Sequence, residues 1–362
     1  MVQFFVFLLA LIGLKIFEEK GSEFNRNRQR KKYISFMMWV FIFQSGLRRH
    51  DVGPDTGGYM RMFYETLDTP WSFLTNDFIA FINYDEGKDP GYFILSKVFG
   101  EFFPSYQLFL IFIAIIFFLG LGKVLYKYLN TNEEVLVALG LYQSLYYGFM
   151  SITGHRQTIA TGLLLFAVPF ILDKKWIKAA ALFLLAITQH KSAILFGGFF
   201  LLPFVKEKHK MILAGSFVAF PIMMSAGTRV ASFFIEDTRM EQYAEFLEYY
   251  EGAGAYFFAA FILLLGACLW WKGKYLAQIN NNNKVFMCAI AVAIMLTPLT
   301  MINQSNMRIV QYYSIFTLIV LPLFLTVYQK NVKINYIHYL FFIFFALYTI
   351  IKKPIPYYFF WQ

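Results

Sequence analysis

Residues 104–122 read PSYQLFLIFIAIIFFLGLG, a run of 19 residues without a charged side chain. A helix needs roughly 20 apolar residues to cross the hydrocarbon core of a bilayer, so this run has the length and polarity of a membrane span. Similar runs recur along the 362-residue chain, which is 59% hydrophobic and 15% charged. Soluble domains carry about a quarter charged residues. The composition therefore predicts an all-α, polytopic transmembrane helical bundle, a single integral membrane domain over 1–362.

The apolar runs, together with the charges between them, predict about 12 spans. Their approximate limits are 2–17, 33–48, 104–122, 135–153, 157–172, 175–190, 192–205, 211–226, 254–271, 285–302, 309–327 and 336–351. Because basic residues follow the first run and do not precede it, we expect a retained span with an outer N-terminus. Two longer outer loops, 48–103 and 227–253, are expected to contain short helices, with 91–103 a candidate half-helix in the outer leaflet.

The basic residues separate into two groups. Of 32 lysines and arginines, 20 fall in the segments predicted to be cytoplasmic, as the positive-inside rule expects. The net charge of +10 could suggest binding to nucleic acid, but the clustering of basic residues between apolar runs argues against it. Arginine departs from the positive-inside rule, because seven of the ten are outside: Arg48, Arg49, Arg61, Arg156, Arg229, Arg239 and Arg308. Arginine is suited to bidentate binding of phosphate or carboxylate, so the outer face is predicted to bind an anion.

The stretch from Arg48 to Tyr59, RRHDVGPDTGGY, contains the densest group of ionisable residues. Its glycines and proline favour a tight, non-helical path. The functional interpretation is an anion-binding turn formed by Arg48 and Arg49 with the Asp55 carboxylate beside it. The alternative is a solvated loop whose arginines anchor the end of a helix. Neither outer loop has carboxylates at a spacing that demands a cation, and Cys268 and Cys288 fall inside spans, so no metal or other cofactor is expected.

Two short polar turns lie between later spans. His155, Arg156 and Gln157 stand at the start of a helix, where the dipole disfavours a cation unless an anion is bound; capping of two helices is the alternative. His190 lies in the turn at 188–192, which reads TQHKS. Imidazole can take a proton from a hydroxyl near neutral pH, although a lone interfacial histidine is more often structural.

Two further groups lie nearer the C-terminus. Arg239 and Tyr243 stand four residues apart in the second outer loop and share a face if that segment is helical; an ordinary amphipathic surface helix is the alternative. Polar residues 303–306 precede Arg308 and Tyr312 at the end of a span, where polar side chains are costly unless they face water or a ligand.

Together these motifs resemble the EpsG-like branch of the Wzy polysaccharide polymerases. The family's Arg-x-x-Val-Gly-x-Asp-x-x-x-Tyr pattern stands here as Arg49, Val52, Gly53, Asp55 and Tyr59. Its Arg-Gln-x-x-Ala, His-x-Ser-Ala and Asn-x-Arg patterns begin at Arg156, His190 and Asn306, and its acidic-Pro-Gly-aromatic segment is similar to residues 89–93, DPGYF. The pair Gly57-Gly58 departs from the bulkier residues that are usual there.

The resemblance implies a metal-independent, inverting glycosyltransferase of GT-C-like architecture in the bacterial cytoplasmic (inner) membrane, with its active site facing the periplasm. It would transfer a growing glycan from undecaprenyl diphosphate to a hydroxyl of a lipid-linked repeat unit. The expected partners are that oligosaccharide lipid, the bilayer, a chain-length regulator and other assembly proteins. His190 or Asp55 is the expected general base. The predicted substrate-binding residues are Arg48, Arg49, Tyr59, Arg156, Gln157, Arg239, Tyr243, Arg308 and Tyr312.

Two other classes of membrane protein remain open at this point. A transporter or flippase of lipid-linked oligosaccharide usually places ionisable groups near the middle of the membrane, whereas the charges here gather at the ends of the predicted spans. An O-antigen-ligase-like transferase would use the same lipid donor and the same arginines with a different acceptor.

Overall fold

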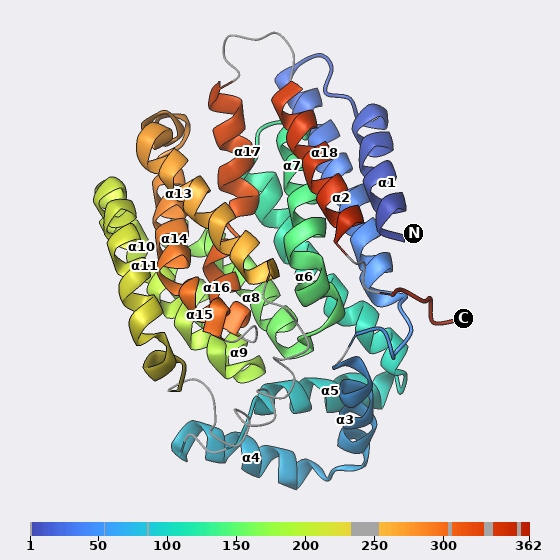
Figure 1. Cartoon of the computed structure of the whole chain (residues 1–362). Coiled ribbons are helices and arrows are strands. Elements are labelled where there is room, and N and C mark those ends of the chain that lie inside the picture. Colours follow the sequence, from blue (N-terminus) through green and yellow to red (C-terminus); the bar gives the residue numbers. More distant parts are fainter. Residues whose placement is uncertain are drawn as a thin grey trace. The chain divides into compact units, whose positions relative to one another are not determined.

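A computed structural model describes residues 2–53, 55–84, 87–232, 253–302, 306–328, 336–352 and 356–362. These residues are helical apart from turns and one isolated β-bridge between Arg48 and Phe359. The chain divides into two compact units, Met1–Ile194 with Val332–Gln362, and Leu195–Asn331. Figure 1 shows the helices by sequence colour, and each unit is described by itself.

The first unit combines long helices with three short ones inserted between the second and third long helices. Its elements are α1 (Val2–Ile16), α2 (Glu23–Gly46), α3 (Thr56–Asp68), α4 (Trp71–Tyr84), α5 (Pro90–Phe102), α6 (Tyr106–Tyr128), α7 (Asn132–Leu141), the π-helical turns η1 (Tyr142–Tyr146) and η2 (Gly148–Ile152), α8 (His155–Leu172), α9 (Trp176–Gln189) and α18 (Tyr336–Ile351). Helix α6 packs between α2 and α8, α8 packs on α9, and α7 packs on α18.

Helices α6 and α8 approach each other closely because two glycines face each other. A Cβ atom on Gly120 would lie 2.6 Å from the carbonyl oxygen of Gly162, and a Cβ on Gly162 would lie 2.9 Å from the Cα of Phe117. Small residues permit such close backbone approach between helices in membranes. This contact brings the start of α8 against the start of α6.

The segment 48–103 is held on the long helices by an aromatic core. Phe63 of α3 stacks on Phe109 of α6 with ring centroids 5.0 Å apart, and Tyr92 of α5 lies 6.0 Å from the same ring. Both Phe63 and Tyr92 are fully buried. The segment predicted as a half-helix at 91–103 is α5, which packs on α3, α4, α6 and α9. The first predicted outer loop therefore presents fixed helices to the ends of α8 and α9.

The second unit is built around α14. Its elements are α10 (Leu202–Val205), η4 (Lys206–Lys208), α11 (His209–Ser232), α13 (Ala253–Ile279), α14 (Asn283–Leu296), α15 (Pro298–Ile302), α16 (Met307–Ser314) and α17 (Thr317–Tyr328), preceded by η3 (Lys191–Leu201), which starts at the end of the first unit. Helix α14 is buried along most of its length and packs on α11, α13, α16 and α17. Cys268 and Cys288 are both free thiols, and Cys288 is buried.

Five helical segments within the described ranges are long and apolar enough to cross a membrane: Tyr106–Tyr128, His155–Leu172, Lys191–Ala226, Gly254–Ile279 and Asn283–Met301. A sixth follows if Met307–Ser314 and Thr317–Val327, bent by 43°, form one span. Val2–Ile16, Trp176–Gln189 and Tyr336–Ile351 are apolar but shorter. The all-helical, multi-pass prediction is confirmed, whereas twelve spans and a GT-C-like architecture are not. Residues 192–205 and 211–226, predicted as two spans, lie in one helical segment.

The close approach of α6 and α8 predicts that Gly120→Ala destabilises the protein. The added Cβ meets a backbone oxygen, so the helices must separate, at about 1–3 kcal/mol. This exceeds the gain of about 0.5–1 kcal/mol from replacing a helical glycine by alanine. The measurement is the apparent melting temperature of detergent-purified protein. Gly58→Ala in α3, where no atom lies within 4 Å of the added Cβ, should melt no lower than wild type. Equal melting temperatures for Gly120→Ala and wild type would contradict the contact.

Candidate functional site: a buried aspartate between an arginine and a histidine

Asp89 lies at the point where the ends of three helical elements meet. It precedes α5 with φ +54°, and Pro90 occupies the first turn of that helix. An aspartate tolerates this left-handed conformation better than most residues, and proline is favoured at a helix start. The carboxylate is only 1% exposed, so it needs polar partners inside the protein.

Three groups donate hydrogen bonds to this carboxylate. Nη1 of Arg156, in the first turn of α8, donates to Oδ2 at 3.0 Å, and Nδ1 of His190, after α9, donates to the same oxygen at 3.2 Å. The backbone N–H of Lys191 donates to Oδ1 at 2.8 Å. The carboxylate thus joins α5, α8 and the turn between α9 and η3, which come from distant parts of the sequence.

The partners of Asp89 decide its charge. Burial on its own would raise the pKa of the carboxyl group, but the hydrogen bond and charge of His190, the Lys191 N–H and the Arg156 guanidinium together lower the pKa to about 2. Asp89 is therefore ionised at neutral pH and orients the imidazole of His190. With Nδ1–H donated to Asp89, a neutral His190 has Nε2 as its basic nitrogen, which is the arrangement of a general base.

Arg156 lies in an aromatic surrounding with part of its donor capacity unused. Three rings lie near its guanidinium carbon: Tyr59 at 5.9 Å, Tyr92 at 5.3 Å and Phe93 at 5.1 Å. Nη2 has the weak acceptor sulfur of Met62 at 3.4 Å, and the buried Nε has no hydrogen-bond partner within the part of the chain that the structure describes. The first turn of α8 contains no acidic residue. A helix start with spare arginine donors favours a bound anion.

The turn at 49–59 packs against the start of α8. Gly53 has φ +101°, and a Cβ there would lie 2.5 Å from Cγ2 of Ile152, so both conformation and space require glycine. The Thr56 hydroxyl donates to the Val52 carbonyl at 2.8 Å. The ring of Tyr59 stacks on His155 with centroids 4.3 Å apart. Two of the predicted motifs are therefore joined by direct contact.

Arg48 and His155 are bonded inside the protein. Arg48 is 2% exposed, and its guanidinium donates to the carbonyls of Ser45 and Ile152. Its Nη2 also lies 2.8 Å from Nε2 of His155. Because an arginine only donates, that nitrogen is the acceptor and His155 is neutral, with Nδ1–H directed at the Tyr106 hydroxyl at 3.4 Å. This geometry gives Arg48 a bonding role within the fold, and its predicted contact with substrate stays a prediction.

Arg49 lies on the surface and is held by the C-terminal segment 356–362. Its side chain forms an ion pair with Asp51, with Nε to Oδ1 at 2.7 Å, and lies over the ring of Tyr358 at 4.6 Å. Its backbone N–H donates to the Tyr358 carbonyl at 2.8 Å, and the N–H of Phe360 donates to the Leu47 carbonyl at 2.9 Å. The last residues of the chain therefore pair with the turn that carries the motif arginine.

The other predicted site residues are placed as follows. Asp55 is half-buried at the start of α3, and Gln157 is 1% exposed in the first turn of α8. Arg308 and Tyr312 lie on α16 of the second unit, which is described separately from the Asp89 cluster. Arg239 and Tyr243 lie outside the described residues. Within the described ranges, no group of three or more His, Cys, Asp or Glu side chains is arranged to hold a metal.

Asp89 is the residue that sequence reasoning missed as a member of the site. The sequence presents it only as the first residue of the DPGYF segment. The Asp-Pro-Gly order is the feature that could have indicated it. A proline is favoured in the first turn of a helix, so the aspartate before it lies at a helix start, where it can contact the ends of other helices. Polar residues at a helix start can be seen in the sequence. The contact of Asp89 with both Arg156 and His190 cannot, because it depends on how the helices pack.

The fold and the cluster define a multi-pass helical membrane protein with a buried Asp–His–Arg site at the ends of its helices. A family model described as the EpsG family matches residues 31–361, so the chain belongs to the EpsG family. Membership implies a polysaccharide polymerase-like, glycosyltransferase-like function. None of the curated proteins and none of the solved structures matches the chain.

The ionised state of Asp89 predicts how stability depends on pH. The pKa of Asp89 is about 2 in the folded protein, below the value of about 4 in an unfolded chain. Ionised Asp89 therefore makes its full contribution to the free energy of unfolding above about pH 4. It is lost as the pH falls towards 2, and it amounts to about 2 kcal/mol. Melting of detergent-purified Asp89→Asn should therefore be lower than that of wild type at pH 7 and fall less on acidification. The exposed Asp68→Asn is the matched control, and identical pH profiles for wild type and Asp89→Asn would contradict the assignment.

The C-terminal pairing predicts that a chain ending at Tyr357 loses order at the Arg49 turn. Loss of the two backbone hydrogen bonds and the Tyr358 ring exposes the Arg49 peptide bond. Tryptic cleavage after Arg49 in purified protein should accelerate about tenfold, as expected for the loss of about 1.4 kcal/mol of local stability. Trp361→Ala, which is exposed and leaves the backbone pairing in place, should cleave at the wild-type rate. Equal rates in the truncated and full chains would show that the pairing does not protect the turn.

Proposed function

We propose that this chain is a polysaccharide polymerase of the bacterial cytoplasmic membrane, with a GT-C-like arrangement of spans and its site on the outer, periplasmic face. It transfers a growing glycan from undecaprenyl diphosphate to a hydroxyl of the next lipid-linked repeat unit. The observation that supports this most strongly is the sharing of one buried carboxylate oxygen by Arg156 and His190. An anion-binding group and a proton-accepting group are thereby held together, in a chain that belongs to the EpsG family.

Arg156 binds the diphosphate of the donor in this proposal. Among the described residues, Nε has no partner and Nη2 has the Met62 sulfur, so both can supply donors for phosphate oxygens. As the bond between the sugar and the diphosphate breaks, negative charge grows on the leaving oxygen. Preorganised donors in a site with few waters stabilise such charge strongly, and the rings of Tyr59, Tyr92 and Phe93 limit the access of water to this guanidinium.

His190 acts on the acceptor. Nε2 accepts the proton of the acceptor hydroxyl while that oxygen attacks the anomeric carbon on the face opposite the diphosphate. The carbon–oxygen bond to the diphosphate breaks, the electron pair leaves with the diphosphate, and the configuration inverts. Asp89 holds the ring and stabilises the imidazolium that forms. The Asp89 contact favours His190 over Asp55 as the base. No cofactor takes part in these steps.

Arg49 supplies a second positive charge nearer the solvent. In its ion pair with Asp51, Arg49 is half-buried and Asp51 is exposed. Pairs at the surface contribute little stability, so a phosphate can replace Asp51 at low cost. The bilayer that carries the lipid substrate, a chain-length regulator and other assembly proteins complete the proposed partners.

The test of this proposal is the glycan of a deletion strain complemented with variants. The deletion strain should retain a single repeat unit and lose chain length; loss of all surface glycan would instead indicate a flippase or a ligase. Arg156→Lys should lower polymer formation at least about a hundredfold, because lysine lacks the bidentate fork, while lipid-linked single units accumulate. Arg61→Lys, at an exposed position of α3, is the matched control and should make normal polymer. Normal long-chain polymer in Arg156→Lys would overturn the diphosphate assignment.

A further inference from the structure

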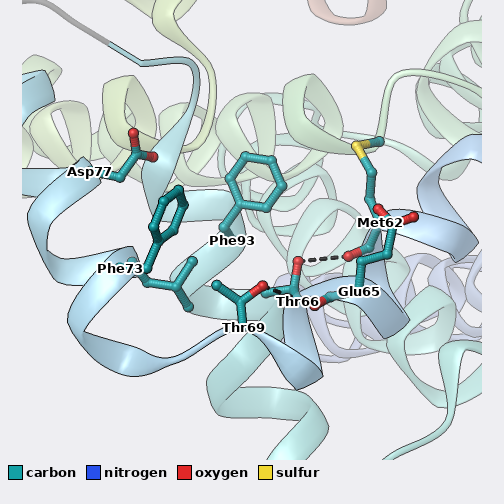
Figure 2. A pocket seen from close by; sticks show the side chains of 8 residues that line it. Met62, Glu65, Thr66, Thr69, Phe73, Asp77 and Phe93 are labelled. Carbon is teal, nitrogen blue, oxygen red and sulfur yellow. Dashed lines mark hydrogen bonds between the residues drawn. The ribbon is translucent and has the colours of Figure 1, made fainter.

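A cleft of ≈ 170 Å³ lies between α3, α4 and α5, outside the Asp89 cluster. Figure 2 shows the side chains that line it, with the rings of Phe73 and Phe93 between the carboxylates of Asp77 and Glu65. Its volume is below the range of about 300–1,000 Å³ that holds drug-sized ligands. The cleft therefore has room for one ring of a ligand and not for a chain of several.

The cleft adjoins Arg156 through two shared side chains. Met62 lines the cleft, and its sulfur lies 3.4 Å from Nη2 of Arg156. Phe93 also lines the cleft, and its ring lies 5.1 Å from the guanidinium carbon. A group bound in the cleft is thus separated from Arg156 by the width of one side chain. Helix α4 contributes Phe73, Leu74 and Asp77 to the cleft and takes no part in the Asp89 cluster.

The chemistry of the lining selects the ligand. Glu65 and Asp77 are hydrogen-bond acceptors when ionised, and none of the described residues that line the cleft is a lysine, arginine or histidine. The hydroxyls of Thr66 and Thr69 donate to backbone carbonyls at 2.6 and 2.9 Å, so their oxygens remain acceptors. A ligand here must bring its own donors and must not be anionic, which excludes the diphosphate.

The aromatic rings supply the other half of the recognition. Phe73 is 64% exposed although it is a large apolar side chain, and Phe93 is half-buried. A sugar ring has these properties: it has an apolar C–H face with hydroxyl groups around it. The C–H face can pack on an aromatic ring while the hydroxyls donate to carboxylates.

We propose that this cleft binds one non-anionic sugar ring of the repeat unit, neutral or amino-substituted, and so positions the sugar that adjoins the reacting bond at Arg156. The proposal rests on the polymerase function proposed above and names the part of the substrate that α3, α4 and α5 recognise. Uronic acids are excluded at this position by the two carboxylates.

The first test uses steady-state kinetics of purified protein in detergent. The probe is the pool of lipid-linked single repeat units extracted from a deletion strain. Glu65→Gln and Asp77→Asn should each raise KM for these units about tenfold, the effect of losing a hydrogen bond to a charged group, with kcat within about twofold of wild type. Asp68→Asn, exposed on α3 and outside the cleft, should keep both constants. Unchanged KM in both cleft variants overturns the proposal.

The second test does not need catalysis. A Thr69→Cys variant, in a background with Cys268→Ser and Cys288→Ser, is labelled with a maleimide in the presence of the glycan released from the same lipids. The glycan should slow labelling, and added Glu65→Gln should remove this protection. Absence of protection overturns the proposal. If the wild type makes no polymer but the glycan still protects, the polymerase function fails and the sugar site stands; if polymer forms without protection, the sugar site alone fails.

Discussion

Asp89 carries a negative charge at a position where only 1% of its surface meets solvent. A charge buried in this way requires compensating partners, and it has them in Arg156, His190 and the Lys191 N–H. Because these partners begin or end different helical elements, the requirement fixes the ends of α5, α8 and α9 relative to one another. The left-handed backbone at Asp89 costs of order 1 kcal/mol, which the three hydrogen bonds offset.

Arg48, Arg156 and Arg49 make different kinds of contact. Both terminal nitrogens of Arg48 are bonded to carbonyls or to His155, so this residue supports the turn. The terminal nitrogens of Arg156 instead meet the Asp89 carboxylate and the weak acceptor sulfur of Met62. Arg49 is at the surface, where the C-terminal segment holds its backbone. The three arginines therefore differ in their surroundings. Arg48 is buried, Arg156 lies at a helix start, and Arg49 is half-buried on the turn that pairs with the C-terminal segment. Of the three, Arg156 is the one to which the proposal assigns the diphosphate, because preorganised donors stabilise developing negative charge.

The sequence predicts the helical, multi-pass class and the polar helix ends, because apolar length and arginine placement are local properties. It therefore singles out Arg156 and His190, which the structure brings together on one carboxylate oxygen. It does not identify Asp89 as their link, since the contacts span 67 and 101 residues. Nor does it predict the buried state of Arg48 or the pairing of Tyr358 with Arg49, which depend on how distant segments pack. The span count is uncertain from sequence for a physical reason: α1, α9 and α18 are apolar but short.

The account's central claim is that Arg156, fixed by Asp89 beside His190, receives the diphosphate of the lipid donor. The most direct measurement is a cryo-electron microscopy structure of the protein with undecaprenyl diphosphate bound. The account predicts phosphate density on Nε and Nη2 of Arg156, with Nη1 still on Asp89 and Nδ1 of His190 still donating to the same carboxylate oxygen. Density for the diphosphate at other residues, with Arg156 bound only to Asp89 and Met62, would contradict it.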